Sequence, residues 1–262
     1  MVYSLLLKRL FGMYYGAPPE VSGDGWGLVL VADGVGGLDL CGTALRHVMG
    51  SQKRPFLVKV VPWGHGFGRW HSDLTNEANR DVHAGRVAEE VAAFRQEFPE
   101  APVYLVGKSG GSGVVVKALE ALPPGSVDRA VLIAPALSPT YDLTRALRAV
   151  DSLVVFWSPL DLIILGAGTR IFGTIDRLKS VSAGLVGFQT PVDSPEVDRE
   201  VQYAKLIQVK WRPEMARTGY LGGHVGPDLP AFLRKYVVPL LIEKSTQSAD
   251  SSSSQASGGA RR

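Results

Sequence analysis

The chain has 262 residues, of which 45% are hydrophobic and 20% charged, so it is long enough to bury a sizeable core. Its formal net charge of +3 comes from 28 basic and 25 acidic residues, and no long basic run is present, which argues against a nucleic-acid partner. Cys41 is the only cysteine, so an intramolecular disulfide and a cysteine-based metal cluster are excluded, and we expect a cytoplasmic protein.

The N-terminal stretch MVYSLLLKRLFGMYYG has a short apolar patch that Lys8 and Arg9 interrupt. It lacks the basic segment, long apolar segment and small-residue cleavage site of a signal peptide. No apolar run in the chain is long enough to span a bilayer. We expect a leader over residues 1–25, with peripheral membrane contact through residues 1–15 as the alternative.

Strand and helix patterns alternate along the rest of the chain. In chain order they predict a strand at 28–33, a helix at 38–50, a strand at 56–63, a polar, Gly-rich loop, a helix at 76–98, a strand at 103–107, a helix at 114–122, a strand at 129–135, a helix at 141–149, strands at 152–158 and 204–211, and a helix at 227–244. Such alternation predicts an α/β fold with a mostly parallel sheet of about six or more strands and helices on both faces.

We expect one domain over residues 26–244, with 162–200 forming a small cap or only a helix and loops. The stretch LIILGAGTRIFG (162–173) either lines an acyl pocket or cap, or belongs to the core. The Ser-rich tail over residues 245–262 has almost nothing to bury and should be disordered.

The stretch VYLVGKSGGSG (103–113) places a serine between a predicted strand and a predicted helix. A phosphate-binding loop ending in Gly-Lys-Ser is excluded, because strand residues and Pro102 stand where its looped backbone would be. A nucleophile elbow needs small residues two positions before and after the serine. Gly107 and Gly111 occupy these positions, so the pattern indicates that Ser109 is a nucleophile.

A serine hydroxyl needs a base, and the base needs a carboxylate to orient it. His224, in the Gly-rich loop TGYLGGHVGPD, is the only histidine after Ser109 and is the predicted base. Asp161, three residues after a predicted strand, is the predicted acid, with Asp176 and then Asp193 as alternatives. The backbone N–H groups of Gly110 and Val35 are the expected oxyanion donors.

Two other patterns indicate weaker hypotheses. The turn Asp33-Gly-Val-Gly-Gly-Leu-Asp39 has an Asp where a dinucleotide-binding turn needs its third Gly or Ala. In WGHGFGRWHSD, the side chains of His65, His71 and Asp73 lack a recognised zinc spacing, so a structural or substrate-pocket role is favoured over a metal site.

Together the segments LVLVADGVGG, VYLVGKSGGSG, VVFWSPLD and YLGGHVG resemble those of an α/β-hydrolase of the lipase/esterase type, in the expected order over about residues 26–242. The resemblance implies a triad of Ser109, Asp161 and His224 and no metal or organic cofactor. Since only about 25 residues precede LVLVAD, we expect the early antiparallel strands of a full family member to be missing or reduced. Two positions depart from the family pattern. Asp33 stands where lipases carry His, so it would brace the oxyanion loop but also bring a negative charge near it. Lys108 precedes the nucleophile and is expected to be a structural or substrate-facing cation.

The expected activity is hydrolysis of a small carboxylic ester through an acyl-enzyme intermediate. The same triad would serve a thioesterase, an amidase or an acyltransferase. A non-catalytic binding module of the same fold is the remaining alternative, and Asp33 is the residue that favours it.

Overall fold

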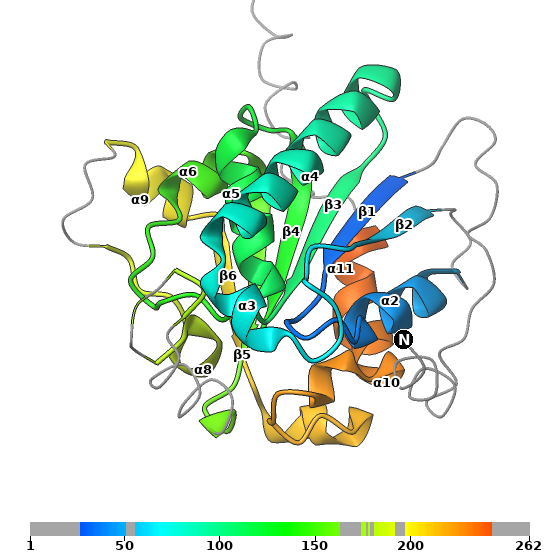
Figure 1. Cartoon of the computed structure of the whole chain (residues 1–262), viewed down its shortest axis with the longest axis vertical. Coiled ribbons are helices and arrows are strands. Elements are labelled where there is room, and N and C mark those ends of the chain that lie inside the picture. The colour runs from blue at the N-terminus through cyan, green and yellow to red at the C-terminus, as the bar shows by residue number, and fades with distance from the viewer. Residues whose placement is uncertain are drawn as a thin grey trace, which may run out of the picture.

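The computed structural model describes residues 27–50, 56–162, 174–176, 178, 181–191 and 197–242. Its six strands form one open parallel sheet in the order β2-β1-β3-β4-β5-β6, which confirms the predicted α/β class (Figure 1). The strands are β1 (Gly27–Ala32), β2 (Phe56–Val61), β3 (Val103–Lys108), β4 (Val127–Ile133), β5 (Val150–Trp157) and β6 (Leu206–Lys210). All six predicted strands are therefore present.

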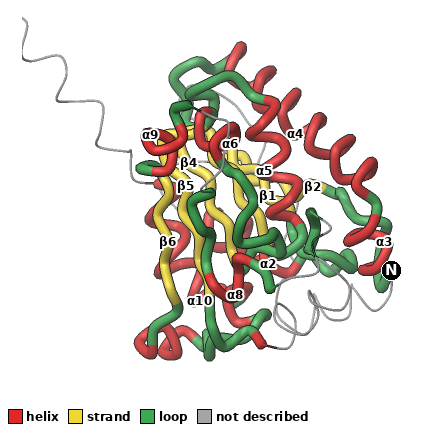
Figure 2. Tube along the Cα trace, turned by 90° about the vertical axis from the view of Figure 1, so that its left-hand side faces the viewer, coloured by secondary structure: helices red, strands yellow, loops and turns green. Residues whose placement is uncertain are grey.

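Helices cover both faces of this sheet (Figures 1 and 2). One face carries α4 (Glu77–Glu97), α5 (Gly111–Ala121) and α6 (Thr144–Arg148), and the other carries α2 (Leu40–Gly50), α10 (Pro230–Phe232) and α11 (Val238–Ile242). The short helices α3 (Trp70–Thr75), α8 (Ala183–Val186) and α9 (Arg199–Tyr203) lie in the connections.

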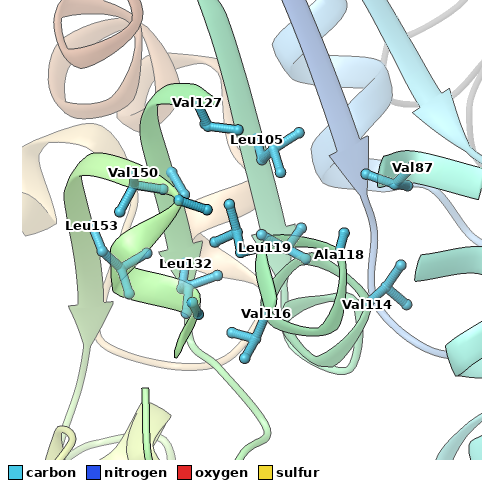
Figure 3. Packing of buried hydrophobic residues seen from close by; sticks show 14 of the residues in the cluster. Val87, Leu105, Val114, Val116, Ala118, Leu119, Val127, Leu132, Val150 and Leu153 are labelled. Atoms are coloured by element: carbon cyan, nitrogen blue, oxygen red, sulfur yellow. The ribbon is translucent and has the colours of Figure 1, made fainter. Parts of the chain in front are cut away.

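The two hydrophobic cores follow from the alternation of side chains along each strand. In β1, Leu28 and Leu30 face the core beneath α4 and α5, whereas Val29 and Val31 face the core beneath α2 and α11. Figure 3 shows the first core, where α5 packs between side chains of β3, β4 and β5 and Val87 of α4. Because every side chain of β1 and β3 is buried, both strands lie in the interior of the sheet.

The C-terminal helix differs from the prediction of one continuous helix at 227–244. It is divided into a 3₁₀ turn, η3 (Gly226–Asp228), then α10, a π-helical segment, η4 (Leu233–Val237), and α11. Pro239 accounts for the π-helical segment, because proline has no N–H with which to continue the α-helical pattern. A second difference is α3, which replaces part of the predicted Gly-rich loop.

Several expectations concern residues outside the described ranges. These are the leader over 1–25, the tail over 245–262, the reduced N-terminal strands and nearly all of 162–173. They stay predictions, as do the domain limits 26–244. No helix in the described part of the chain is both long and apolar enough to cross a membrane.

Candidate active site

Ser109 lies at the carboxyl edge of the sheet, between the end of β3 and the start of α5. Its φ of 51° is in the left-handed region, which costs a residue with a Cβ about 1–2 kcal/mol. Two hydrogen bonds hold this backbone in place: Ser109 N–H donates to the Ile133 carbonyl (2.9 Å), and Ala136 N–H donates to the Ser109 carbonyl (3.1 Å). The turn is therefore a strained elbow that presents the side chain of Ser109.

Close backbone packing explains the glycines on both sides of this elbow. A Cβ at Gly107 would lie 2.7 Å from the Cα of Ser112. A Cβ at Gly111 would lie only 2.1 Å from the Ala32 carbonyl oxygen. No larger residue fits at either position unless α5 moves away from the sheet.

The structure brings together the three side chains that the sequence predicts as a triad. The Oγ of Ser109 lies 2.9 Å from Nε2 of His224. The Nδ1 of His224 lies 2.6 Å from Oδ2 of Asp161. If Nδ1 carries the proton and donates it to Asp161, Nε2 is left as an acceptor for the Ser109 hydroxyl, which is the arrangement that activates a serine.

Asp161 reaches His224 from the turn that follows β5. In this turn Asp161 N–H donates to the Ser158 carbonyl (3.2 Å), and Ser158 N–H donates to the Gly184 carbonyl (2.9 Å). Asp161 is 3% exposed, so its contact with His224 is shielded from water. The first alternative acid, Asp176, instead accepts hydrogen bonds from the N–H and hydroxyl of Ser138. The second, Asp193, lies outside the described residues.

Burial lowers the pKa of His224, and the positive charge of Lys108 lowers it further. The hydrogen bond to Asp161 and the negative charge of that carboxylate act in the opposite direction, but they do not cancel the effect of burial. The imidazole is therefore neutral at pH 7 and able to accept a proton.

The two expected oxyanion donors lie beside each other. A Cβ at Gly110 would lie 2.6 Å from Cγ1 of Val35, and a Cβ at Gly34 would lie 3.5 Å from the Cβ of Ser109. The neighbouring N–H groups of Gly34 and Gly36 are already bound by carboxylates. Within the described ranges, the N–H groups of Val35 and Gly110 have no hydrogen-bond partner. They are thus available to a ligand near Ser109.

Asp33 braces the oxyanion loop by hydrogen bonds, which is one of the two roles that the sequence suggested for it. Its Oδ1 accepts from Gly34 N–H (2.8 Å) and its Oδ2 from Gly42 N–H (2.7 Å) at the start of α2. Trp63 Nε1 also donates to the Asp33 carbonyl (2.8 Å). Burial raises the pKa of Asp33. The hydrogen bonds from backbone N–H groups to both carboxylate oxygens act against this effect of burial, and they spread and partly neutralise the negative charge.

Asp73 is a second carboxylate that holds this loop, and the sequence did not reveal its role. Its Oδ2 accepts from Gly36 N–H (2.8 Å), while its Oδ1 accepts from His65 N–H (2.7 Å) and lies 2.8 Å from His65 Nδ1. His71 is exposed on α3 and does not join them. No group of three or more His, Cys, Asp or Glu side chains in the described ranges could hold a metal ion. The motif WGHGFGRWHSD thus has a structural role beside the oxyanion loop.

Comparison with known proteins gives a family match. The family model described as "Serine aminopeptidase, S33" (Hydrolase_4) matches residues 62–242. No curated protein matches the chain. A solved structure of Trichoderma reesei cutinase with a phosphonate inhibitor is 19% identical, with a TM-score of 0.40, and the alignment covers 92% of this chain and 87% of the cutinase. The poly(3-hydroxybutyrate) depolymerase LpqC of Bordetella parapertussis is 15% identical, with a TM-score of 0.48 and coverage of 82% and 80%.

Proposed function

This chain belongs to the α/β-hydrolase family described as serine aminopeptidase, S33, and on that premise we propose that it is a serine hydrolase that cleaves carboxylic esters. The family match covers most of the chain and confirms the resemblance to α/β-hydrolases. The observation that carries the proposal is the continuous hydrogen-bonded series from Ser109 through His224 to Asp161.

In the proposed mechanism, Nε2 of His224 takes the hydroxyl proton as the Oγ of Ser109 attacks the ester carbonyl carbon. Asp161 stabilises the imidazolium that forms. The N–H groups of Val35 and Gly110 bind the oxyanion, and the N-terminus of α5 adds a favourable dipole. His224 then gives the proton to the leaving alcohol, and water hydrolyses the acyl-enzyme by the same steps with His224 again as base.

Exposed apolar side chains near the site support an ester with an apolar group. Large exposed hydrophobic residues occur in three connections, those that follow β2, β5 and β6. They are Phe67 and Trp70 after β2, Leu160 and Leu162 after β5, and Leu221 and Val225 after β6, in the loop that carries His224. In a parallel sheet, the connections that follow the strands emerge at the carboxyl edge, where Ser109 lies. Apolar substrate groups would cover these side chains on binding.

Labelling with a fluorophosphonate, which reacts with activated serines, tests the proposal without a known substrate. We expect wild-type protein to be labelled, and Ser109→Ala and His224→Ala to lose labelling by several orders of magnitude. Ser126→Ala is a matched control, because Ser126 is partly exposed at the opposite end of the sheet and its hydroxyl donates to the Pro123 carbonyl, away from the site. Labelling that survives in Ser109→Ala would exclude the proposed nucleophile.

The bond that is cleaved needs a second experiment. The matched family's description names an aminopeptidase, and the same triad would serve an amide or a thioester. We expect 4-nitrophenyl esters to be hydrolysed with a kcat/KM far above that of the anilides of the same acids. Preferred hydrolysis of aminoacyl anilides would replace the esterase proposal by a peptidase. A folded wild-type protein that neither labels nor turns over any ester would indicate a non-catalytic module.

A further inference from the structure

Lys108 is the last residue of β3 and immediately precedes Ser109. Because side chains alternate along a strand, Lys108 points away from the direction that Ser109 takes, and it is only 2% exposed. A buried ammonium group is stable only where acceptors or counter-charges surround it. Its partners therefore define its role, and they exclude the substrate-facing cation that the sequence allowed.

The main partner of Lys108 is the backbone of the predicted base. Its Nζ donates to the His224 carbonyl at 2.9 Å, and Oδ1 of Asp228 lies 3.8 Å away. These two residues belong to the loop that carries His224 and to the η3 turn that follows it. One side chain thus connects the strand that ends at the nucleophile with the loop that carries the base.

Apart from the hydrogen bond between the His224 imidazole and Asp161, few contacts hold the loop around His224. Leu221 and Val225 are 72% and 59% exposed, Gly223 is exposed and has no side chain, and Gly222 packs only its backbone against Leu160. Within the described ranges, the bond from Lys108 is the only one made by the backbone of residues 221–224. Glycine-rich segments have many accessible backbone conformations, so a single charged hydrogen bond has a large share in fixing this one.

We propose that Lys108 is a positioning residue for the base: its buried ammonium group holds the His224 backbone at the distance from Ser109 that proton transfer needs. This inference rests on the proposed function. It adds a fourth residue to the site, one that touches neither the substrate nor the reacting atoms.

The charge of Lys108 has a second effect, on the protonation of His224. The charged groups that act on the imidazole are Lys108 from β3 and Asp161 from the turn after β5. The carboxylates that face Lys108 are Asp228 of η3 and Asp33 of the oxyanion loop. The Cys41 thiol on α2 also lies near Lys108, but it stays neutral because burial raises its pKa. Since a positive charge lowers the pKa of the imidazole, loss of Lys108 should raise it.

The pH dependence of fluorophosphonate labelling tests this role in the full-length protein. In the wild type, the rate constant should fall with decreasing pH and have its midpoint below 6.5, because the pKa of His224 is lowered from that value. For Lys108→Met we expect a roughly tenfold slower rate at pH 8 and a midpoint about half a unit higher or more. Lys108→Gln, whose amide still donates, should show the raised midpoint with a smaller loss of rate.

Lys205→Met is the matched control, because Lys205 also donates to a carbonyl, that of Leu147 (3.0 Å), away from the site. It should keep the wild-type rate and midpoint. Folded Lys108→Met and Lys108→Gln proteins with the wild-type midpoint and rate would overturn the inference. If Lys108→Met does not fold, the pH midpoint of labelling of Lys108→Gln tests the inference alone: a raised midpoint supports it, and the wild-type midpoint overturns it. A wild-type protein that is not labelled would instead contradict the proposed function, so the two failures are distinguishable.

Discussion

The close approach of α5 to β1 predicts a large effect for the smallest possible substitution at the elbow, Gly111→Ala. The added Cβ would lie 2.1 Å from the Ala32 carbonyl oxygen and 2.4 Å from that of Asp33. This is roughly 1 Å shorter than a normal C···O contact. Both obstacles are backbone atoms, so no side-chain rotation relieves the clash, and α5 would have to move about 1 Å away from the sheet.

We expect Gly111→Ala to lower the free energy of unfolding by about 3 kcal/mol or more, because α5 is buried between the sheet and α4. For a domain of this size, that corresponds to a Tm lower by roughly 6–12 °C. Displacement of α5 should also abolish fluorophosphonate labelling, because the helix begins two residues after Ser109.

Gly85→Ala is the matched control, since the same substitution in α4 places a Cβ where no atom lies within 4 Å. Here alanine should increase stability by about 0.5–1 kcal/mol through its better helix propensity. Urea unfolding of both variants measures the effect as a change of midpoint at constant slope. A Gly111→Ala protein within about 0.5 kcal/mol of the wild type would refute this account of the elbow.

Two further predictions concern the carboxylates near the site. Asp73→Ala should slow fluorophosphonate labelling about tenfold or more, because the Gly36 N–H loses its acceptor and the loop that carries Val35 is no longer held. The control His71→Ala should keep the wild-type rate. An Asp73→Ala protein that is labelled as fast as His71→Ala would contradict this prediction. Burial raises the pKa of Asp228 from 3.8 to about 7. Between these two pH values the carboxyl group is protonated in the folded protein but ionised in the unfolded chain. That contribution to stability is complete below pH 4 and lost as the pH rises through 7. The Tm of Asp228→Asn relative to the wild type should therefore increase between pH 4 and pH 8, whereas a constant difference would disprove the raised pKa.

Local patterns were sufficient to predict most elements of this fold. Buried parallel strands appear as short apolar runs, and the turn glycines and prolines mark their ends, so all six strands were predictable within a few residues. Ser109, Asp161 and His224 could be predicted as a triad because each follows a predicted strand in a recognisable order, and the structure brings these three side chains together. The break in the C-terminal helix at Leu229 was missed because the prediction of one continuous helix ignored Pro230, which begins α10 and keeps the preceding residue extended.

The roles of Lys108 and Asp73 could not be derived in this way. Asp73 binds the N–H of a residue 37 positions before it, and Lys108 binds the carbonyl of a residue 116 positions after it. Neither separation matches a helix or strand period, so no local pattern indicates these contacts. The motif around Asp73 was noticed only for its metal-binding residue types.

The sequence by itself determined the strands and most of the helices, the elbow glycines and the residue types available for chemistry, because these depend on neighbours along the chain. Only the tertiary structure decided the 2.9 Å between Ser109 and His224, which are 115 residues apart, and the direction of the buried Lys108 side chain. Such distances arise from the packing of β3, β5 and the connection after β6 at one edge of the sheet. They depend on the fold as a whole, since no short segment contains both partners.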